Sequence, residues 1–334
     1  MAMTCLVSCS SDDAVVLGID DVAGKTFHSY GTDKVRVTVN GVEDDEVVSF
    51  EKDKENEGIL NVSISGMMPF LDGGEMIVPV KVKEGKELKF YGETGTDRYN
   101  MSITGKFYYL DGYKDYKRVE IDCIYKTQYP KNGAEYVFDF TKKPVKVKMY
   151  RTFDVDVEGE KIELHDLAQQ TFDIITSHIS ETVQQLKMTF HDNGTVDVAL
   201  KKTGSGFESW MSSQYRFNQN GDLAIIVPDD RLAELNKTFL GNEKKTSPFG
   251  WKFPTDLGSV YALNFKIWEN EDDALSISLY PTIELAAVEL IMTGNAKEWA
   301  TKKEFSMIKA MRQQALDNRF GYNYVTEFTS LPVE

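Results

Sequence analysis

The chain has 334 residues, a net charge of −15 and a hydrophobic content of 41%. Its length and apolar content are enough for a sizeable core, in two domains or in one elongated domain. The negative charge argues against nucleic acid and anionic lipid as partners of a basic face, because both would repel the protein. No stretch reaches the roughly 18 consecutive apolar residues that a membrane-spanning helix needs.

Residues Leu6-Val7-Ser8-Cys9 have the pattern of a bacterial lipobox, in which the cysteine thiol is acylated and becomes the first mature residue. We therefore expect Cys9 to carry a lipid anchor. Residues 1–9 are then the remainder of a signal peptide whose basic region lies upstream of Met1. Several acyl chains on one cysteine would hold a protein at the bilayer permanently. Residues 10–22, which include Asp12 and Asp13, follow as an acidic tether.

The cysteines and histidines predict neither a disulfide framework nor a metal site. Cys5 falls in the signal, Cys9 is the expected anchor, and Cys123 stands alone in a strand pattern. The histidines include no pair three or four residues apart, so a shared metal ion is not expected, and no cofactor is predicted. They are His28, His165, His178 and His191.

Residues 23–128 form the first predicted domain and consist of strand and turn patterns. In the clearest strand, Val35, Val37 and Val39 alternate with polar residues before an Asn40-Gly41 turn. Similar strands are expected at 60–64, 76–82, 99–107 and 119–125. Such short spacing without helices indicates antiparallel hairpins in a sandwich or a strongly curled sheet.

Residues 129–334 form the second predicted domain, after the break at Tyr129–Gly133. One strand is expected at 142–150, followed by a long helix at about 162–187 with a continuous apolar stripe. The stripe consists of Leu164, Ala168, Phe172, Ile175, Ile179, Val183 and Leu186. The strand after this helix is expected to begin at Met188.

Hairpins should follow on both sides of the turns His191–Gly194 and Asn220–Gly221, and between 260–268 and 275–280. Further helices are expected at 228–240, 282–293 and 301–318. The predicted fold class is thus α+β: an antiparallel β-rich N-terminal half, and a C-terminal half with a long helix packed on an antiparallel sheet.

Three segments carry a family resemblance: Thr-Val-Asn-Gly at 38–41, Ser-Ile-Thr-Gly at 102–105, and Leu-Lys-Met-Thr-Phe-His-Asp-Asn-Gly-Thr-Val at 186–196. Together with the lipobox and the acidic tether, they resemble a Bacteroides lipoprotein family that is catalogued as a domain of unknown function. The resemblance implies sheets that curl around a long helix, as in lipid-binding proteins of the bactericidal/permeability-increasing type. Acidic residues after the cysteine are also similar to the surface-export tag of many Bacteroidetes lipoproteins. A solvated tether explains them equally well.

Motifs of catalysis are incomplete. Gly24-Lys25-Thr26 lacks the first glycine of a phosphate loop, since position 19 is Ile19. Gly204-Ser205-Gly206 does not match a nucleophile elbow. The many carboxylate pairs are typical of solvated turns. We therefore predict a binding protein and not an enzyme.

Two binding hypotheses remain open. The first is an apolar ligand, a lipid or fatty acid, in a groove between the helix and the sheet. Its lining residues would be Phe172, Ile175, Ile179, Met188 and Phe190. The alternative interpretation of these five residues is that they form ordinary core.

The second hypothesis is a surface platform of aromatic rings that binds glycans or serves adhesion, because sugars stack their C–H faces on such rings. Its residues would be Tyr109, Tyr113, Trp210, Trp251 and Trp268, with Tyr108 and Tyr116 beside them. Half-buried strand aromatics produce the same pattern. For either ligand, the sequence predicts an outer-membrane lipoprotein, on the cell surface or on the periplasmic face, attached to the membrane through its N-terminal lipid.

Overall fold

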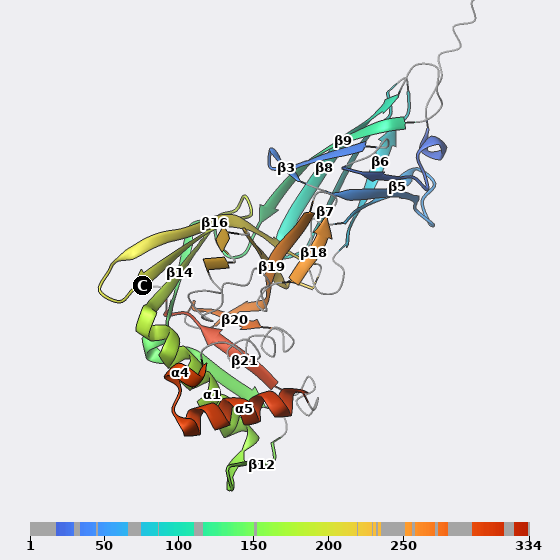
Figure 1. Cartoon of the computed structure of the whole chain (residues 1–334). Coiled ribbons are helices and arrows are strands. Elements are labelled where there is room, and N and C mark those ends of the chain that lie inside the picture. Colours follow the sequence, from blue (N-terminus) through green and yellow to red (C-terminus); the bar gives the residue numbers. More distant parts are fainter. Residues whose placement is uncertain are drawn as a thin grey trace, which may run out of the picture.

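The computed structural model describes residues 18–29, 34–44, 46–65, 75–85, 87–109, 116–149, 152–218, 220–228, 230–231, 233–234, 251–255, 258–270, 273–279, 296–316 and 324–332. The chain is β-rich, with two large sheets, a small two-stranded sheet and few helices (Figure 1). The lipobox, Cys9 and most of the predicted tether lie outside the described residues.

The first sheet has nine strands and follows the short helix η1 (Ile19–Asp21). Its strands are β1 (Thr26–His28), β2 (Lys34–Val39), β3 (Val42–Asp44), β4 (Val47–Lys52), β5 (Ile59–Ser65), β6 (Glu75–Lys83), β7 (Lys89–Gly95), β8 (Tyr99–Tyr109) and β9 (Tyr116–Thr127).

This sheet closes on itself. Strands β4 to β9 pair in sequence order, β9 pairs with β2, and β1 pairs with both β2 and β4. The curled sheet agrees with the sequence prediction, but the expectation of antiparallel hairpins throughout was wrong. Pairings β1–β2 and β2–β9 are parallel.

The inner face of the closed sheet is filled by alternate side chains of its strands, as the period-2 pattern predicted. Phe27, Phe50, Phe90 and Phe107 are buried and pack with ring centroids 4.8–5.9 Å apart. Cys123 lies in the same interior, where burial raises the pKa of its thiol to about 12. It is therefore a neutral core residue at ordinary pH.

Strand β7 was not predicted, because Gly92 and Gly95 look like turn residues. In the structure, glycine allows close packing between β7 and the neighbouring strand β8. Phe90 lies directly opposite Gly105, and a Cβ on Gly105 would come within 2.0 Å of the Phe90 ring. The ring covers the glycine, so the two residues fill one space.

The second sheet has ten strands, mostly on one continuous path. They are β10 (Ala134–Asp139), β11 (Val145–Met149), β14 (Val183–Phe190), β15 (Thr195–Lys202), β16 (Phe207–Phe217), β17 (Leu223–Val227), β18 (Trp251–Thr255), β19 (Gly258–Glu269), β20 (Leu275–Leu279) and β21 (Tyr324–Thr329). The remaining elements are η2 (Phe140–Lys142), the hairpin β12 (Asp154–Val157) and β13 (Glu160–Glu163), and helices α1 (Leu164–Thr182), α4 (Ala296–Trp299) and α5 (Lys302–Leu316).

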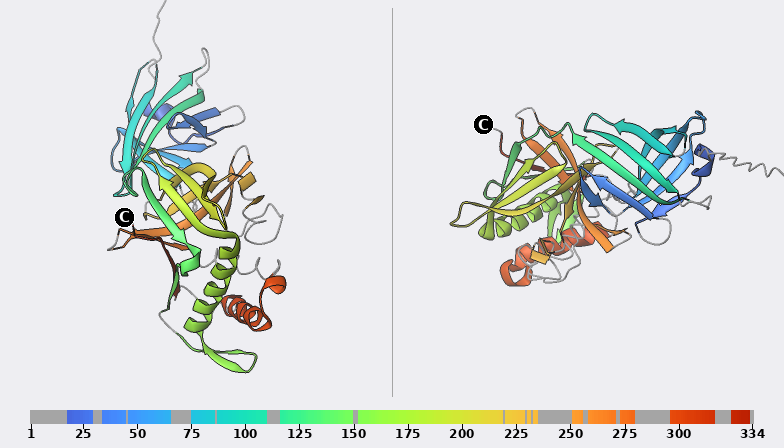
Figure 2. Two further views of the ribbon diagram at one scale, coloured as in Figure 1. Left: turned by 90° about the vertical axis from the view of Figure 1, so that its left-hand side faces the viewer. Right: turned by 90° about the horizontal axis from the view of Figure 1, so that it is seen from above.

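This second sheet also curls strongly (Figure 2). Its path begins at β10 and ends at β21 and β11, yet Leu331, just after β21, donates its N–H to the Val137 carbonyl of β10 at 2.7 Å. The two ends of the path therefore come together.

The long helix is shorter than predicted. Helix α1 ends at Thr182, and β14 begins at Val183 with no loop between them. The prediction that the helix reaches residue 187 was wrong, since Val183 and Leu186 continue the apolar spacing but pair with β15 as strand residues. The C-terminal helix predicted at 301–318 is α5, whereas residues 282–293 and most of 228–240 lie outside the described part.

Helix α1 lies along the free edge of strand β11 and supplies hydrogen-bond partners for its backbone. The Gln169 amide accepts from Val147 N–H at 2.9 Å and donates to the Val145 carbonyl at 3.0 Å, as a neighbouring strand would. His165 Nε2 lies 3.0 Å from the Val147 carbonyl, so this nitrogen carries the hydrogen. These bonds fix α1 against the sheet.

Two buried clusters organise the apolar side chains. The first cluster, which we call the helix core, contains buried residues of β11, β12, β13, α1 and α5, such as Val147, Leu167 and Met311. The second cluster, which we call the shared core, is larger and contains residues of both large sheets. The predicted domain boundary between 128 and 129 falls between β9 and β10, and the shared core spans it.

Polar bonds join the two sheets at what we call the junction, residues Tyr125, Thr127, Tyr215, Arg216 and Phe217. The Tyr125 hydroxyl accepts the Phe217 N–H at 2.9 Å, and the Thr127 and Tyr215 hydroxyls lie 2.6 Å apart. Arg216 is 1% exposed, and its guanidinium lies 5.1 Å from the Tyr125 ring centroid. The junction therefore links β9 to β16 inside the protein.

The Gly105–Phe90 contact predicts that Gly105→Ala destabilises the protein. Overpacking of this kind costs about 1–3 kcal/mol, because the added methyl group must displace the buried ring. Urea unfolding of both proteins measures the difference. The control is Gly206→Ala, where a Cβ meets no atom within 4 Å. Equal stability of Gly105→Ala and the wild type would contradict the packing argument.

Candidate functional site

A surface pocket of about 300 Å³ lies beside α1, where α4 and α5 approach it. Its size is at the lower limit of small-ligand pockets. Most of its lining comes from one stripe of α1, with residues spaced as neighbours on a helix face. The lining residues are Lys143, Asp173, Ile174, Ser177, His178, Glu181, Trp299 and Glu304.

An aromatic stack forms one wall of the pocket. The His178 imidazole lies flat on the Trp299 indole, with ring centroids 4.0 Å apart and planes at 6°. His178 Nδ1 is 3.2 Å from the Glu181 carboxylate, one helical turn further along α1. The stack thus joins α1 to α4.

The charges of the pocket are unevenly neutralised. Asp173 receives Lys143 Nζ on one oxygen and the Gln169 amide on the other, each at 3.0 Å. Glu181 is 72% exposed, and among the described residues its carboxylate bonds to His178 alone. With three carboxylates and one lysine in the lining, the pocket favours neutral or cationic groups over anions.

The third carboxylate, Glu304, lies in the first turn of helix α5. It accepts the Thr301 N–H at 2.7 Å, while Thr301 Oγ1 accepts the Glu304 N–H at 3.3 Å. This is a capping box, which satisfies N–H groups at a helix start. The hydrogen bonds from Thr301 lower the pKa of Glu304, so the carboxylate is charged at neutral pH.

The predicted apolar groove is occupied by core packing in the described structure. Phe172 is buried in the helix core, while Met188 and Phe190 are buried in the shared core. Ile175 is half-buried, and half-buried Ile179 packs against the shared core. Four of the five residues therefore divide between two clusters, Ile175 belongs to neither, and the five do not line one open cavity.

The predicted aromatic platform is also dispersed. Trp210 is buried at a bulge of β16, and Trp268 is half-buried in β19. Trp251 lies in β18 and Tyr109 in β8, but their side chains, like Tyr113 as a whole, lie outside the described residues. Tyr108 is 38% exposed, with Lys106 and Arg118 near its ring and its hydroxyl 2.6 Å from Glu120.

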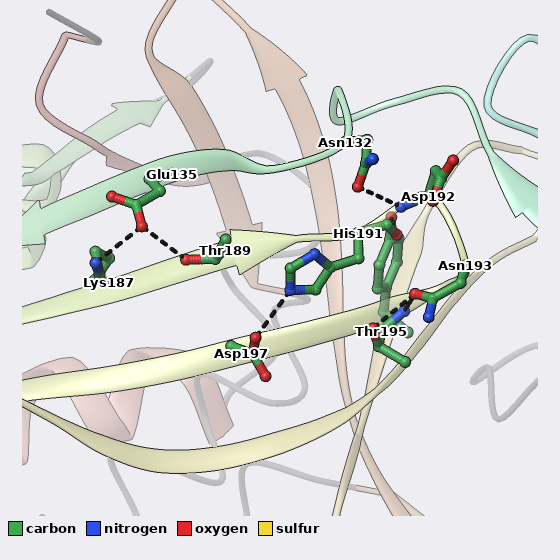
Figure 3. A network of polar contacts seen from close by, with 10 residues as sticks. Asn132, Glu135, Lys187, Thr189, His191, Asp192, Asn193, Thr195 and Asp197 are labelled. Atoms are coloured by element: carbon green, nitrogen blue, oxygen red, sulfur yellow. Dashed lines mark hydrogen bonds and ion pairs between the residues drawn. The ribbon is translucent and has the colours of Figure 1, made fainter.

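A second polar cluster covers the outer face of β10, β14 and β15 (Figure 3). His191 Nε2 lies 2.8 Å from Asp197, and Lys187 lies 2.9 Å from Glu135. Hydrogen bonds from Ser212 and His191 lower the pKa of Asp197. Because serine and histidine both bind the aspartate, the histidine does not lie between them as it does in a nucleophilic triad.

The sequence interpretation missed the pocket. It considered Trp210, Trp251 and Trp268 but not Trp299, and it considered His178 only as a metal ligand. Two signals were available. Asp173, Ser177 and Glu181 recur at four-residue steps as a polar stripe on the predicted helix, and Thr301-x-x-Glu304 is a capping box.

Comparisons with other proteins add no identification. The chain matches no protein-family model, no curated protein and no solved structure. Within the described residues, no helix has the length and hydropathy to cross a membrane, and no group of three metal-ligating side chains gathers.

The capping box predicts a pH-dependent contribution of Glu304 to stability. Its folded pKa is lowered, so the contribution is complete above the unfolded pKa and is lost as the pH falls through the folded pKa. Glu304→Gln should thus be less stable than the wild type at pH 7, with a smaller difference at about pH 3. Urea unfolding at the two pH values measures this.

Thr301→Ala provides the matched comparison, because it removes the hydroxyl that accepts the Glu304 N–H and keeps the Thr301 backbone N–H that the carboxylate accepts. The double variant loses both side-chain acceptors of the capping box and should be less stable at pH 7 than either single variant. A difference between Glu304→Gln and the wild type that stays constant with pH would contradict this assignment.

Proposed function

We propose that the chain is a cell-envelope lipoprotein with a non-catalytic role, which binds a neutral saccharide in the pocket between α1, α4 and α5. The stack of His178 on Trp299 carries this proposal, because an indole face beside polar groups suits the C–H face of a sugar. Carboxylates of Asp173, Glu181 and Glu304 and the Ser177 hydroxyl are partners for sugar hydroxyl groups. The uncompensated negative charge argues against uronic or sulfated sugars.

The lipid anchor at Cys9 completes the proposal. Eight residues, 10–17, lie between Cys9 and Gly18, and a fully extended chain from one to the other spans at most about 30 Å. Gly18 and η1 precede the closed sheet, whereas α1, α4 and α5 lie at the opposite end of the molecule (Figure 1). An anchored protein would thus hold its closed sheet near the outer membrane and its pocket away from it, on the cell surface or in the periplasm.

An apolar ligand, a lipid or fatty acid, is the second candidate. The half-buried state of Ile175 and Ile179 favours it, because these two side chains of α1 keep part of their surface accessible. Phe172, Met188 and Phe190 would have to leave their packed positions to take part. The saccharide is favoured because its proposed site requires no buried core side chain to leave its packed position, and His178, which covers the indole, is 28% exposed.

Trp299→Ala tests the saccharide proposal. We expect the affinity for a bound sugar to fall by about tenfold, since the stacking surface is removed. The probes are maltohexaose, cellohexaose, mannohexaose and chitohexaose, measured by titration calorimetry. Phe207→Ala is the control, because Phe207 is 40% exposed and does not line the pocket. Absence of binding by the wild type, or equal binding by Trp299→Ala, would refute a saccharide site here.

Cys9→Ala, made in a full-length precursor, tests the anchor. Without the thiol no acyl chain can be attached, and the protein should move from the membrane fraction to the soluble fraction. Mass spectrometry of the wild-type N-terminal peptide should show an acylated cysteine. Unchanged membrane partitioning of the variant would exclude the anchor and leave the pocket proposal standing.

A further inference from the structure

We infer that His178 is an internal competitor for the ligand: its imidazole covers the indole face on which the saccharide stacks, and binding requires it to move aside. This inference rests on the proposed saccharide site and assigns a regulatory role to one residue in it. The first observation is the geometry of the stack. A centroid distance of 4.0 Å and an angle of 6° place one flat ring directly on another, in the position a ligand ring would take.

The second observation is the composition of the pocket. Trp299 offers the only extended aromatic face among the lining residues apart from His178 itself. The other lining groups are charged or polar, with Ile174 as the one aliphatic side chain. A saccharide that uses both the carboxylates and an aromatic face must therefore take its stacking contact from the Trp299 indole.

The third observation is that the His178 imidazole can leave the Trp299 indole at a small cost in free energy. His178 is 28% exposed, and within the described part of the chain its imidazole hydrogen-bonds only to Glu181, which is 72% exposed on the same helix. Both groups are accessible to water, so the imidazole can turn away from Glu181 without leaving a buried polar atom unpaired. The Glu181 carboxylate would then be free to accept a sugar hydroxyl.

Substitution of His178 shows whether this residue competes with the ligand or supports the binding site. His178→Ala exposes the indole and should bind the saccharide about two- to tenfold more tightly than the wild type, which is the value of one aromatic pair. Alanine is also the best helix former, so the variant should retain α1. His178→Phe keeps a ring on the indole and should not gain affinity. His191→Ala, a histidine of similar exposure outside the pocket, should bind like the wild type.

Titration calorimetry with the same four hexasaccharides decides between the outcomes. Tighter binding by His178→Ala alone supports the inference. Equal or weaker binding by this variant overturns it, while wild-type binding that depends on Trp299 leaves the proposed function intact. Binding by His178→Ala but not by the wild type supports the inference and refutes the proposed function of the unmodified protein. If neither protein binds any probe, both proposals fall.

Discussion

The junction between the two sheets is the constraint on which the rest of the molecule depends. The Tyr125 hydroxyl is the partner of the buried Phe217 N–H, and a buried N–H without a partner costs about 1–3 kcal/mol. Burial raises the pKa of Tyr215 to about 12 and that of Tyr125 as well, so both hydroxyls stay neutral. Burial lowers the pKa of Arg216, while Tyr125, Asp44 and Glu46 act in the opposite direction. A basic side chain is thus buried between the two sheets.

The pocket depends on this constraint through a series of contacts. The junction fixes β16, which pairs with β15, and β15 pairs with β14, the direct continuation of α1. At its other side α1 is held to β11 by the amide of Gln169. Helix α1 therefore has a fixed position, and its polar stripe meets α4 and α5 where the pocket lies. In the proposed function, the same rigidity would hold the pocket at a set distance from a lipid anchor.

Sequence patterns predicted those features that depend on local order. The alternation of Val35, Val37 and Val39 located β2, and the apolar stripe located the start of α1. The patterns failed where partners distant in sequence decide the outcome. Gly92 and Gly95 looked like turn residues although they lie in β7. The Phe90 ring that covers Gly105 cannot be paired with that glycine from spacing alone. Val183 fits a helix and a strand equally well, and only its pairing with Lys202 selects the strand. Trp299 meets His178 by tertiary packing, which no local signal reports.

Hydrogen exchange of Tyr125→Phe, measured as a function of urea, tests most directly whether the junction makes the two sheets one cooperative unit. Peptides from β5 and β15 should report the same unfolding free energy in the wild type, because the shared core includes both sheets. The substitution should lower both values together, by about 1–3 kcal/mol. A decrease confined to the peptides of one sheet, or two separate unfolding free energies in the wild type, would show that the sheets fold independently and would contradict the account.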